Sequence, residues 1–205
     1  VELASGLYVH GGNNDENLFL LDGTPLYQIN HSMGLFSSFN ADVVKNVDFY
    51  KSGFPARYGG RLSSVMDVRT ADGDLQHYHG SYRIGLLDGS FQLEGPIQRG
   101  KTSFNLGLRR SWLDLITTPV FAIINRSNKE DKININYNFH DLNAKIVHLF
   151  SDRSRLSLST YWGRDHLFTK GESLWGSNTA IDRDVIENRF NWGNFNMAQI
   201  GRAHV

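Results

Sequence analysis

The chain has 205 residues, enough for one large domain or two small ones. Its 21 lysines and arginines balance 21 aspartates and glutamates, so no charge excess points to nucleic acid as a partner. No cysteine is present, and no apolar run approaches the roughly 18 residues of a membrane-spanning helix. A helical membrane protein is therefore excluded, whereas a transmembrane β-barrel is not, because alternating strands leave no hydropathy peak.

The first seventy residues contain short apolar runs that are interrupted by glycines. A turn is expected at Asp22-Gly23, where Asp22 can accept hydrogen bonds from nearby backbone amides. Asn40-Ala41-Asp42 can cap a short helical turn at Val43–Asn46. Strands are expected at Leu18–Leu21, Val47–Tyr50 and Val65–Arg69. This pattern predicts a small mixed α+β unit.

From about Gly80 onward, apolar and polar residues alternate along several runs. Period-two alternation predicts strands with one apolar face and one polar face. A soluble β-sandwich alternates as well, so the direction of the apolar face decides between the two architectures. A barrel turns Phe104, Leu106, Leu108, Leu156 and Leu158 outward around a polar lumen, whereas a sandwich packs them inward.

The connections between these runs differ in length. Arg99-Gly100 and Ser151–Ser154 are short turns, whereas Leu113–Ile135 and Phe168–Asn188 are expected to be long loops at the opposite ends of the hairpins. Outer-membrane barrels have this arrangement, with tight periplasmic turns and long extracellular loops. Aromatic residues near the strand ends are expected at the two water–lipid boundaries: Trp112, Tyr137, Phe150, Tyr161, Trp162 and Trp192.

The glycine-rich run Gly6–Gly12 is followed by Leu18–Pro25, an apolar run that ends in Asp-Gly-Thr-Pro. These two segments resemble the plug of TonB-dependent outer-membrane receptors, in which a strand with an Arg-Gly pair is followed by an apolar strand and Asp-Gly. Asn40–Gly53 resembles a later plug helix and strand, and Phe54–Val65 matches the Tyr-Gly-Gly turn, with a string that looks like the Bacteroidetes-type branch. In the second half, Leu93–Phe104 resembles the first periplasmic hairpin of the barrel, and Asp141–Lys145 a later strand.

This resemblance implies a mainly β fold: a small mixed α+β plug followed by the first six or so antiparallel strands of a 22-stranded transmembrane β-barrel, which they leave incomplete. We expect the C-terminal part of the plug domain at residues 1–72 and the N-terminal barrel strands at residues 73–199. Residues 200–205 resemble the frame translation of a short-read sequencing adapter and are expected to be an artefact.

The resemblance also implies which residues have structural and gating roles in the plug. They are His10, Gly11, Gly12, Asp22, Gly23, Gly53, Arg57, Tyr58, Gly59 and Gly60. The glycines allow positive φ at tight turns, and Arg57 is either a partner for lumen carboxylates or an ordinary solvated arginine. The family's Arg-Gly is His10-Gly11 here, and a neutral imidazole is a weaker and pH-sensitive substitute for an arginine that contacts barrel acids.

In function, the resemblance implies an outer-membrane transporter for energised uptake of a small nutrient ligand. Expected partners are the inner-membrane TonB complex, outer-membrane lipid, the unidentified ligand and a surface lipoprotein, and not nucleic acid. Candidate ligand contacts in the extracellular loops are Arg126, Lys129, Lys170, Glu172 and Trp175.

Neither a cofactor nor a metal nor catalysis is expected. His77 and His79 lie on one face of a strand, but two ligands do not make a metal site. The alternative function is that of a soluble extracellular β-rich binding or adhesion module. A secreted hydrolase built around His77 and His79 is a third and weaker hypothesis.

Overall fold

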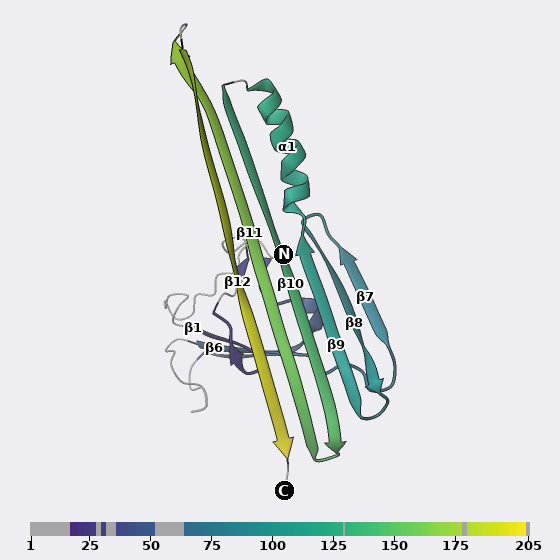
Figure 1. The fold of residues 1–205 in the computed structure, drawn as a ribbon. Coiled ribbons are helices and arrows are strands. Elements are labelled where there is room, and N and C mark those ends of the chain that lie inside the picture. The colour runs from purple at the N-terminus through teal and green to yellow at the C-terminus, as the bar shows by residue number, and fades with distance from the viewer. Residues whose placement is uncertain are drawn as a thin grey trace.

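The computed structural model describes residues 17–27, 30–31, 36–51, 64–128, 130–177 and 180–203. These residues form a small four-stranded sheet, a two-stranded ribbon, a large six-stranded sheet and one α-helix (Figure 1). The small sheet and the ribbon come from residues 17–70, and the large sheet comes from residues 79–203. Within the described ranges, no helix has both the length and the apolar character needed to cross a membrane.

The small sheet has the strand order β2-β1-β6-β5. Its strands are β1 (Asn17–Leu21), β2 (Thr24–Pro25), β5 (Val44–Tyr50) and β6 (Ser64–Thr70). Strands β1 and β6 pair in parallel, whereas the other pairs are antiparallel. The predicted turn after β1 is confirmed, because Asp22 and Gly23 both have positive φ, at 48° and 79°.

The predicted helical turn at Val43–Asn46 is wrong, although its cap is in the expected place. Asn40 caps a shorter 3-10 turn, η3 (Ala41–Val43), by accepting a hydrogen bond from the Asp42 amide at 3.1 Å. Strand β5 begins directly at Val44 because these residues pair with β6 and form the edge of the sheet. The ribbon consists of β3 (Asn30–His31) and β4 (Phe36–Ser37).

The large sheet is an antiparallel meander in which each strand pairs with the next along the chain. Its strands are β7 (His79–Ile84), β8 (Asp88–Gln98), β9 (Thr102–Ser111), β10 (Asp131–Ser151), β11 (Ser154–Ser177) and β12 (Ala180–Ala203). Tight turns join β8 to β9 and β10 to β11 at one end of the sheet, as predicted (Figure 1).

The predicted long loops are wrong. Residues 113–135 contain helix α1 (Leu113–Ser127) and the start of β10, and residues 168–188 continue β11 and β12 almost to their connection. Strands β10, β11 and β12 extend well beyond the end of β9, and α1 lies beside this extension (Figure 1). Asn125 of α1 satisfies the edge of β10 by bonding to both the amide and the carbonyl of Ile133, at 2.9 and 2.8 Å.

The two faces of the large sheet differ as a barrel requires. Ser103, Asn105 and Arg109 are buried and donate hydrogen bonds to carbonyls of Asp72, Ala71 and the ribbon residue Ser37. Leu108 and Leu158 on the opposite face are 43% and 38% exposed. Phe104, Leu106 and Leu156 share that outer face and are partly exposed. The prediction of an outward apolar face is therefore confirmed, and the inward packing of a sandwich is absent from the described strands.

The aromatic residues divide between the two faces, which corrects part of the expected boundary belt. Trp162 and Phe150 are exposed on the outer face. Tyr137 and Tyr161 are instead buried on the inner face, and Trp192 packs against Tyr137 with ring centroids 6.4 Å apart. Strand alternation already places Tyr161 on the same inner face as Ser157 and Ser159, so the expectation of a boundary belt overlooked the direction of this ring.

Candidate functional site at the interface of the two sheets

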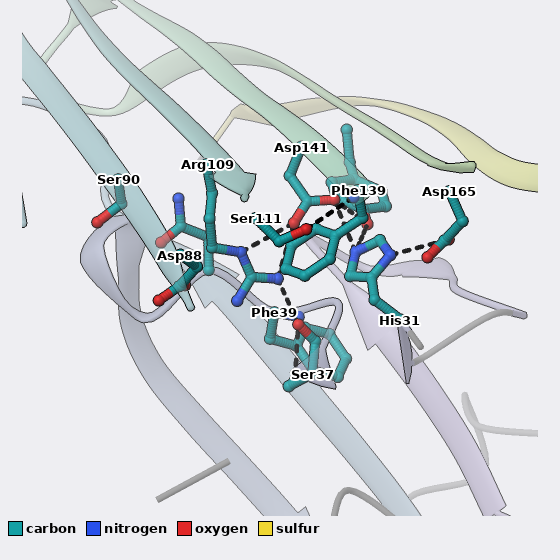
Figure 2. Close-up of polar contacts among 12 residues, drawn as sticks. His31, Ser37, Phe39, Asp88, Ser90, Arg109, Ser111, Phe139, Asp141 and Asp165 are labelled. Atoms are coloured by element: carbon teal, nitrogen blue, oxygen red, sulfur yellow. Dashed lines mark hydrogen bonds and ion pairs between the residues drawn. The ribbon is translucent and has the colours of Figure 1, made fainter. Parts of the chain in front are cut away.

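The ribbon meets the large sheet at a buried polar cluster around His31 (Figure 2). His31 lies on β3 and is 2% exposed. Its Nε2 is 2.8 Å from an oxygen of Asp141 on β10, and its Nδ1 is 2.9 Å from an oxygen of Asp165 on β11. The imidazole also stacks on Phe139, with ring centroids 4.2 Å apart. Because both ring nitrogens face carboxylates, both must donate, and His31 is an imidazolium.

Arg109 completes the charge balance of this cluster. From β9 it donates to one oxygen of Asp141 through two nitrogens, at 2.9 and 2.7 Å, and it also donates to the Ser37 carbonyl of the ribbon. Two buried carboxylates, Asp141 and Asp165, thus face two cations. We call His31, Arg109, Asp141 and Asp165 the His31 cluster.

Two tyrosines also donate to the carboxylates of the His31 cluster. Tyr161 donates at 3.0 Å to the Asp141 oxygen that His31 contacts, and Tyr137 donates to the Asp165 oxygen that His31 does not contact. Burial lowers the pKa of His31, but the hydrogen bonds and charges of Asp141 and Asp165 outweigh burial and raise the pKa above its ordinary value of 6.5. The geometry and the direction of this shift agree on a charged histidine.

A second, partly buried cluster lies nearer the tight turns of the large sheet. Lys145 of β10 approaches Asp22 at 3.2 Å, Asp72 at 2.9 Å and the Thr70 carbonyl at 2.9 Å. Arg155 of β11 pairs with the other oxygen of Asp72 at 3.1 Å. We call Lys145, Arg155, Asp22 and Asp72 the Lys145 cluster. It too holds two cations and two carboxylates. Burial raises the pKa of Asp72, but its interactions with Lys145 and Arg155 outweigh burial and lower the pKa below 3.8.

The structure corrects the role expected for Asp22. Instead of serving amides within its own turn, its carboxylate accepts hydrogen bonds from the amide and the hydroxyl of Thr70, at 3.0 and 2.5 Å. The parallel pairing of β1 with β6 brings Leu21 opposite Val68 and so carries Asp22 to the end of β6. Asp22 therefore joins the two central strands of the small sheet to Lys145 of the large sheet.

Further contacts fix the small sheet along most of the width of the large one. Asn105 of β9 donates to the Ala71 carbonyl at 3.2 Å, and Asn196 of β12 donates to the Pro25 carbonyl at 3.0 Å. At Gly107 the two units approach closely: a Cβ on this glycine would lie 2.3 Å from Cγ1 of Val43 in η3. Only glycine fits between the backbone of β9 and η3.

Most of the predicted plug-motif residues lie outside the described residues: His10, Gly11, Gly12, Gly53, Arg57, Tyr58, Gly59 and Gly60, together with the predicted ligand contact Lys129. Of the motif residues that are described, Asp22 belongs to the Lys145 cluster and Gly23 forms the adjacent turn.

The other predicted ligand contacts lie on the extensions at the far end of the large sheet. Lys170 and Glu172 of β11 form an ion pair at 2.6 Å, and Glu172 also pairs with Arg183 of β12 at 2.6 Å. In the strand register, the backbone of Trp175 lies opposite that of Asp182 near the β11–β12 connection. Arg126 lies apart from them in the last turn of α1.

Sequence reasoning missed the residues that hold the two units together. Three of these residues could be noticed in the sequence. Arg109, Asp141 and Lys145 each place a charge at a polar-face position of an alternating strand. His31 could not be noticed in this way, since its ribbon has only two residues in each strand. Charges on a face that is expected to be buried need partners of opposite charge, and this requirement marks Arg109, Asp141 and Lys145 as contact residues.

The histidines considered as metal ligands have another role. His79 lies 3.0 Å from Asp74, which also accepts hydrogen bonds from the amides of Gln76 and His77. These amide bonds, with a smaller contribution from His79, lower the pKa of Asp74 to about 2. In the part of the chain that the structure describes, no three metal-ligating side chains come together.

Residues 2–64 match the family model of the TonB-dependent Receptor Plug Domain. The siderophore receptor PirA from Pseudomonas aeruginosa has a similar structure, with a TM-score of 0.52 and 14% identity over 95% of this chain and 37% of that one. PirA from Acinetobacter baumannii gives a TM-score of 0.45 and 13% identity over 90% of this chain and 37% of that one.

A comparison with curated proteins finds no match. The chain spans 37% of the length of the solved receptors that it resembles. The plug match covers the strands of the small sheet up to the start of β6, and the structural likeness extends over the large sheet as well. Residues 2–64 therefore match the plug domain of TonB-dependent receptors, and the chain as a whole shares the fold of the matching part of a solved siderophore receptor. We call the small sheet with the ribbon the plug, and the large sheet the wall.

Proposed function

We propose that this receptor takes up a nutrient ligand across the bacterial outer membrane and that its plug gates the lumen. The observation that carries the proposal is the opposition of the two faces of the wall. Buried charges on the inner face hold the plug, while the outer face exposes apolar residues such as Leu108 and Leu158. An apolar outer face around a polar interior suits a sheet that spans lipid.

The two charged clusters give the plug a defined resting position. Each cluster joins plug residues to neighbouring strands of the wall, and each is balanced in charge. Undocking the plug would leave the carboxylates and cations of both clusters without their partners. The plug therefore stays docked until work is done on it. We infer that this work comes from the inner-membrane TonB complex, which pulls on the plug.

The ligand itself stays a prediction. The solved receptors that share this fold are siderophore receptors, so ferric siderophores are the first class to test. The loop contacts Arg126, Lys129, Lys170, Glu172 and Trp175 remain proposals, as do the surface lipoprotein and the Bacteroidetes-type branch. We further propose that the plug ends, and the wall begins, in the connection between β6 and β7, near residue 72.

Membrane extraction distinguishes a receptor from the alternative, a soluble extracellular binding module. The receptor should remain in the outer-membrane fraction after washing with carbonate and should dissolve in detergent. A soluble or peripheral module would be released by the wash. Release of the full-length protein in that experiment would overturn the proposal.

An engineered disulfide tests the gating role. A Cβ on Gly107 would lie 3.6 Å from the Cβ of Val43, inside the range of about 3.5–4.5 Å found in disulfides. The described chain offers no competing thiol, because it has no cysteine. The double variant Val43→Cys/Gly107→Cys should therefore cross-link the plug to the wall under oxidising conditions.

Uptake is measured for the ligand class that a receptor-deletion strain fails to use, chosen from ferric siderophores, cobalamin, glycans and peptides. The oxidised double variant should bind the ligand but not import it, and a reductant should restore import. Val43→Cys alone is the matched control. Import by the fully oxidised variant at the rate of that control would show that the plug does not leave the wall at this contact.

A further inference from the structure

The outer face of the wall carries a row of basic residues on three neighbouring strands. Strand register places Arg110 of β9 opposite His140 of β10, and His140 opposite Arg164 of β11. Their sequence neighbours Arg109 and Asp141 are buried against the plug, so strand alternation directs the basic residues to the other face. Adjacent strands lie about 4.8 Å apart, and this basic row is therefore roughly 10 Å wide.

An apolar groove lies directly beside the basic row. It is one register step nearer the tight turns, and its floor consists of paired residues on four strands: Phe91, Leu108, Leu142 and Trp162. The groove has a volume of about 440 Å³, and Arg110 and His140 also line it. The His140 ring meets the Trp162 ring nearly edge-on, with centroids 5.1 Å apart. The groove thus has an apolar floor and a basic rim.

This combination fits an amphiphile that has an anionic head. A free anion would gain nothing from the apolar floor, and an uncharged lipid would gain nothing from the basic row. Guanidinium groups match the geometry of phosphate oxygens and can bind them through two hydrogen bonds. Arg110 pairs with Asp114 at 3.2 Å, but its side chain is 57% exposed, and an exposed pair of this kind is weak enough to exchange partners.

We propose that this groove holds a lipid with a phosphate headgroup from the outer leaflet of the membrane. Its acyl chain lies on the apolar floor, and its phosphate accepts hydrogen bonds from the guanidinium groups of Arg110 and Arg164, with His140 between them. The inference rests on the proposed function, which places this face in lipid and the tight turns on the periplasmic side. The basic row then lies near the extracellular boundary, where the apolar band ends.

Native mass spectrometry of the full-length receptor, stripped of lipid in mild detergent, tests the proposal. The probe is dioleoyl phosphatidylglycerol, and dioleoylglycerol, which has the same acyl chains but no phosphate, is the comparison. The receptor should retain phosphatidylglycerol preferentially, and Arg110→Gln/Arg164→Gln should weaken its binding by about ten-fold or more, because charge-assisted hydrogen bonds to the headgroup are lost. Equal retention of the two lipids, or equal binding by the variant, would overturn the proposal.

A control variant removes the same charge at the other end of the wall. Arg99→Gln/Arg153→Gln changes two turn residues and should leave lipid retention unchanged. Inorganic phosphate alone should not displace the lipid, and full displacement would show that the apolar floor does not contribute. Carbonate extraction of the same variants separates the two hypotheses: a receptor that stays in the membrane but binds both lipids equally refutes only the lipid site.

Discussion

At the scale of single residues, His31 makes the docking of the plug depend on pH. Its pKa is raised above 6.5 in the docked state, so the docked state binds the proton more tightly than the undocked state does. Its contribution is therefore complete below about pH 6.5 and is lost as the pH rises through the raised pKa. Asp72 has a pKa below 3.8, and its contribution is lost only when the pH falls through that lowered value.

Between pH 5 and 9, docking should therefore weaken as the pH rises. We expect the plug amides of β6 to lose protection from hydrogen exchange over this range, after correction for the intrinsic pH dependence of exchange. His31→Asn should remove this pH dependence and cost about 3 kcal/mol of docking free energy, because two buried carboxylates then face only Arg109.

His31→Arg is the matched control for this experiment. A guanidinium stays charged throughout the range, is planar enough to stack on Phe139, and can donate to both carboxylates. It should keep the plug docked at pH 9. Protection that is constant with pH in the unmodified receptor would contradict a charged His31.

At the scale of elements, the approach of η3 to β9 limits how closely the plug docks. Gly107→Ala places a methyl group 2.3 Å from Cγ1 of Val43, so one of the two elements must move. We expect a loss of about 1–3 kcal/mol of docking free energy, measured by hydrogen exchange of β6. Val43→Ala removes the clashing methyl groups.

The double variant Val43→Ala/Gly107→Ala should accordingly be less destabilised than the sum of its two single variants. Simple additivity would mean that the contact between Val43 and Gly107 does not control docking. The same geometry explains why a glycine stands in the middle of an otherwise regular strand.

The elements also show what could be predicted from the sequence and what could not. The six wall strands alternate with period two, so their inner and outer faces could be assigned at Phe104 and Leu158. The extensions of β11 and β12 have polar residues on both faces, and this looks like loop sequence although backbone pairing continues. The extension of β10 alternates at Ile133, Ile135 and Tyr137, so this part could have been predicted as a strand. Helix α1 was missed because Pro119 and two threonines interrupt its apolar spacing.

The charged interface was predictable only in part, for a related reason. Polar positions such as Asp141 and Lys145 follow from strand alternation, but their partners come from plug segments distant in sequence. The approach of His31 to Asp165 spans 134 positions of sequence, and no local pattern encodes such a contact. The sequence motifs indicated a plug, but only the three-dimensional structure showed which residues join the plug to the wall.

At the scale of the whole molecule, the environment of the outer face decides between a receptor wall and a soluble module. Leu158 lies midway along the wall portion of β11 and is 38% exposed. In water, Leu158→Arg at such a surface position changes the free energy of unfolding by about 0.5 kcal/mol or less. In lipid, the same charge near the middle of the bilayer costs about 2–4 kcal/mol.

We expect the larger cost, measured as the shift in urea unfolding of the full-length receptor in lipid vesicles. Val185→Arg is the control, because Val185 is similarly exposed, at 48%, but lies on the extension of β12 beyond the end of β9. It should unfold like the unmodified receptor. If both substitutions were neutral, the outer face would be in contact with water, and neither the transport function nor the lipid groove could stand.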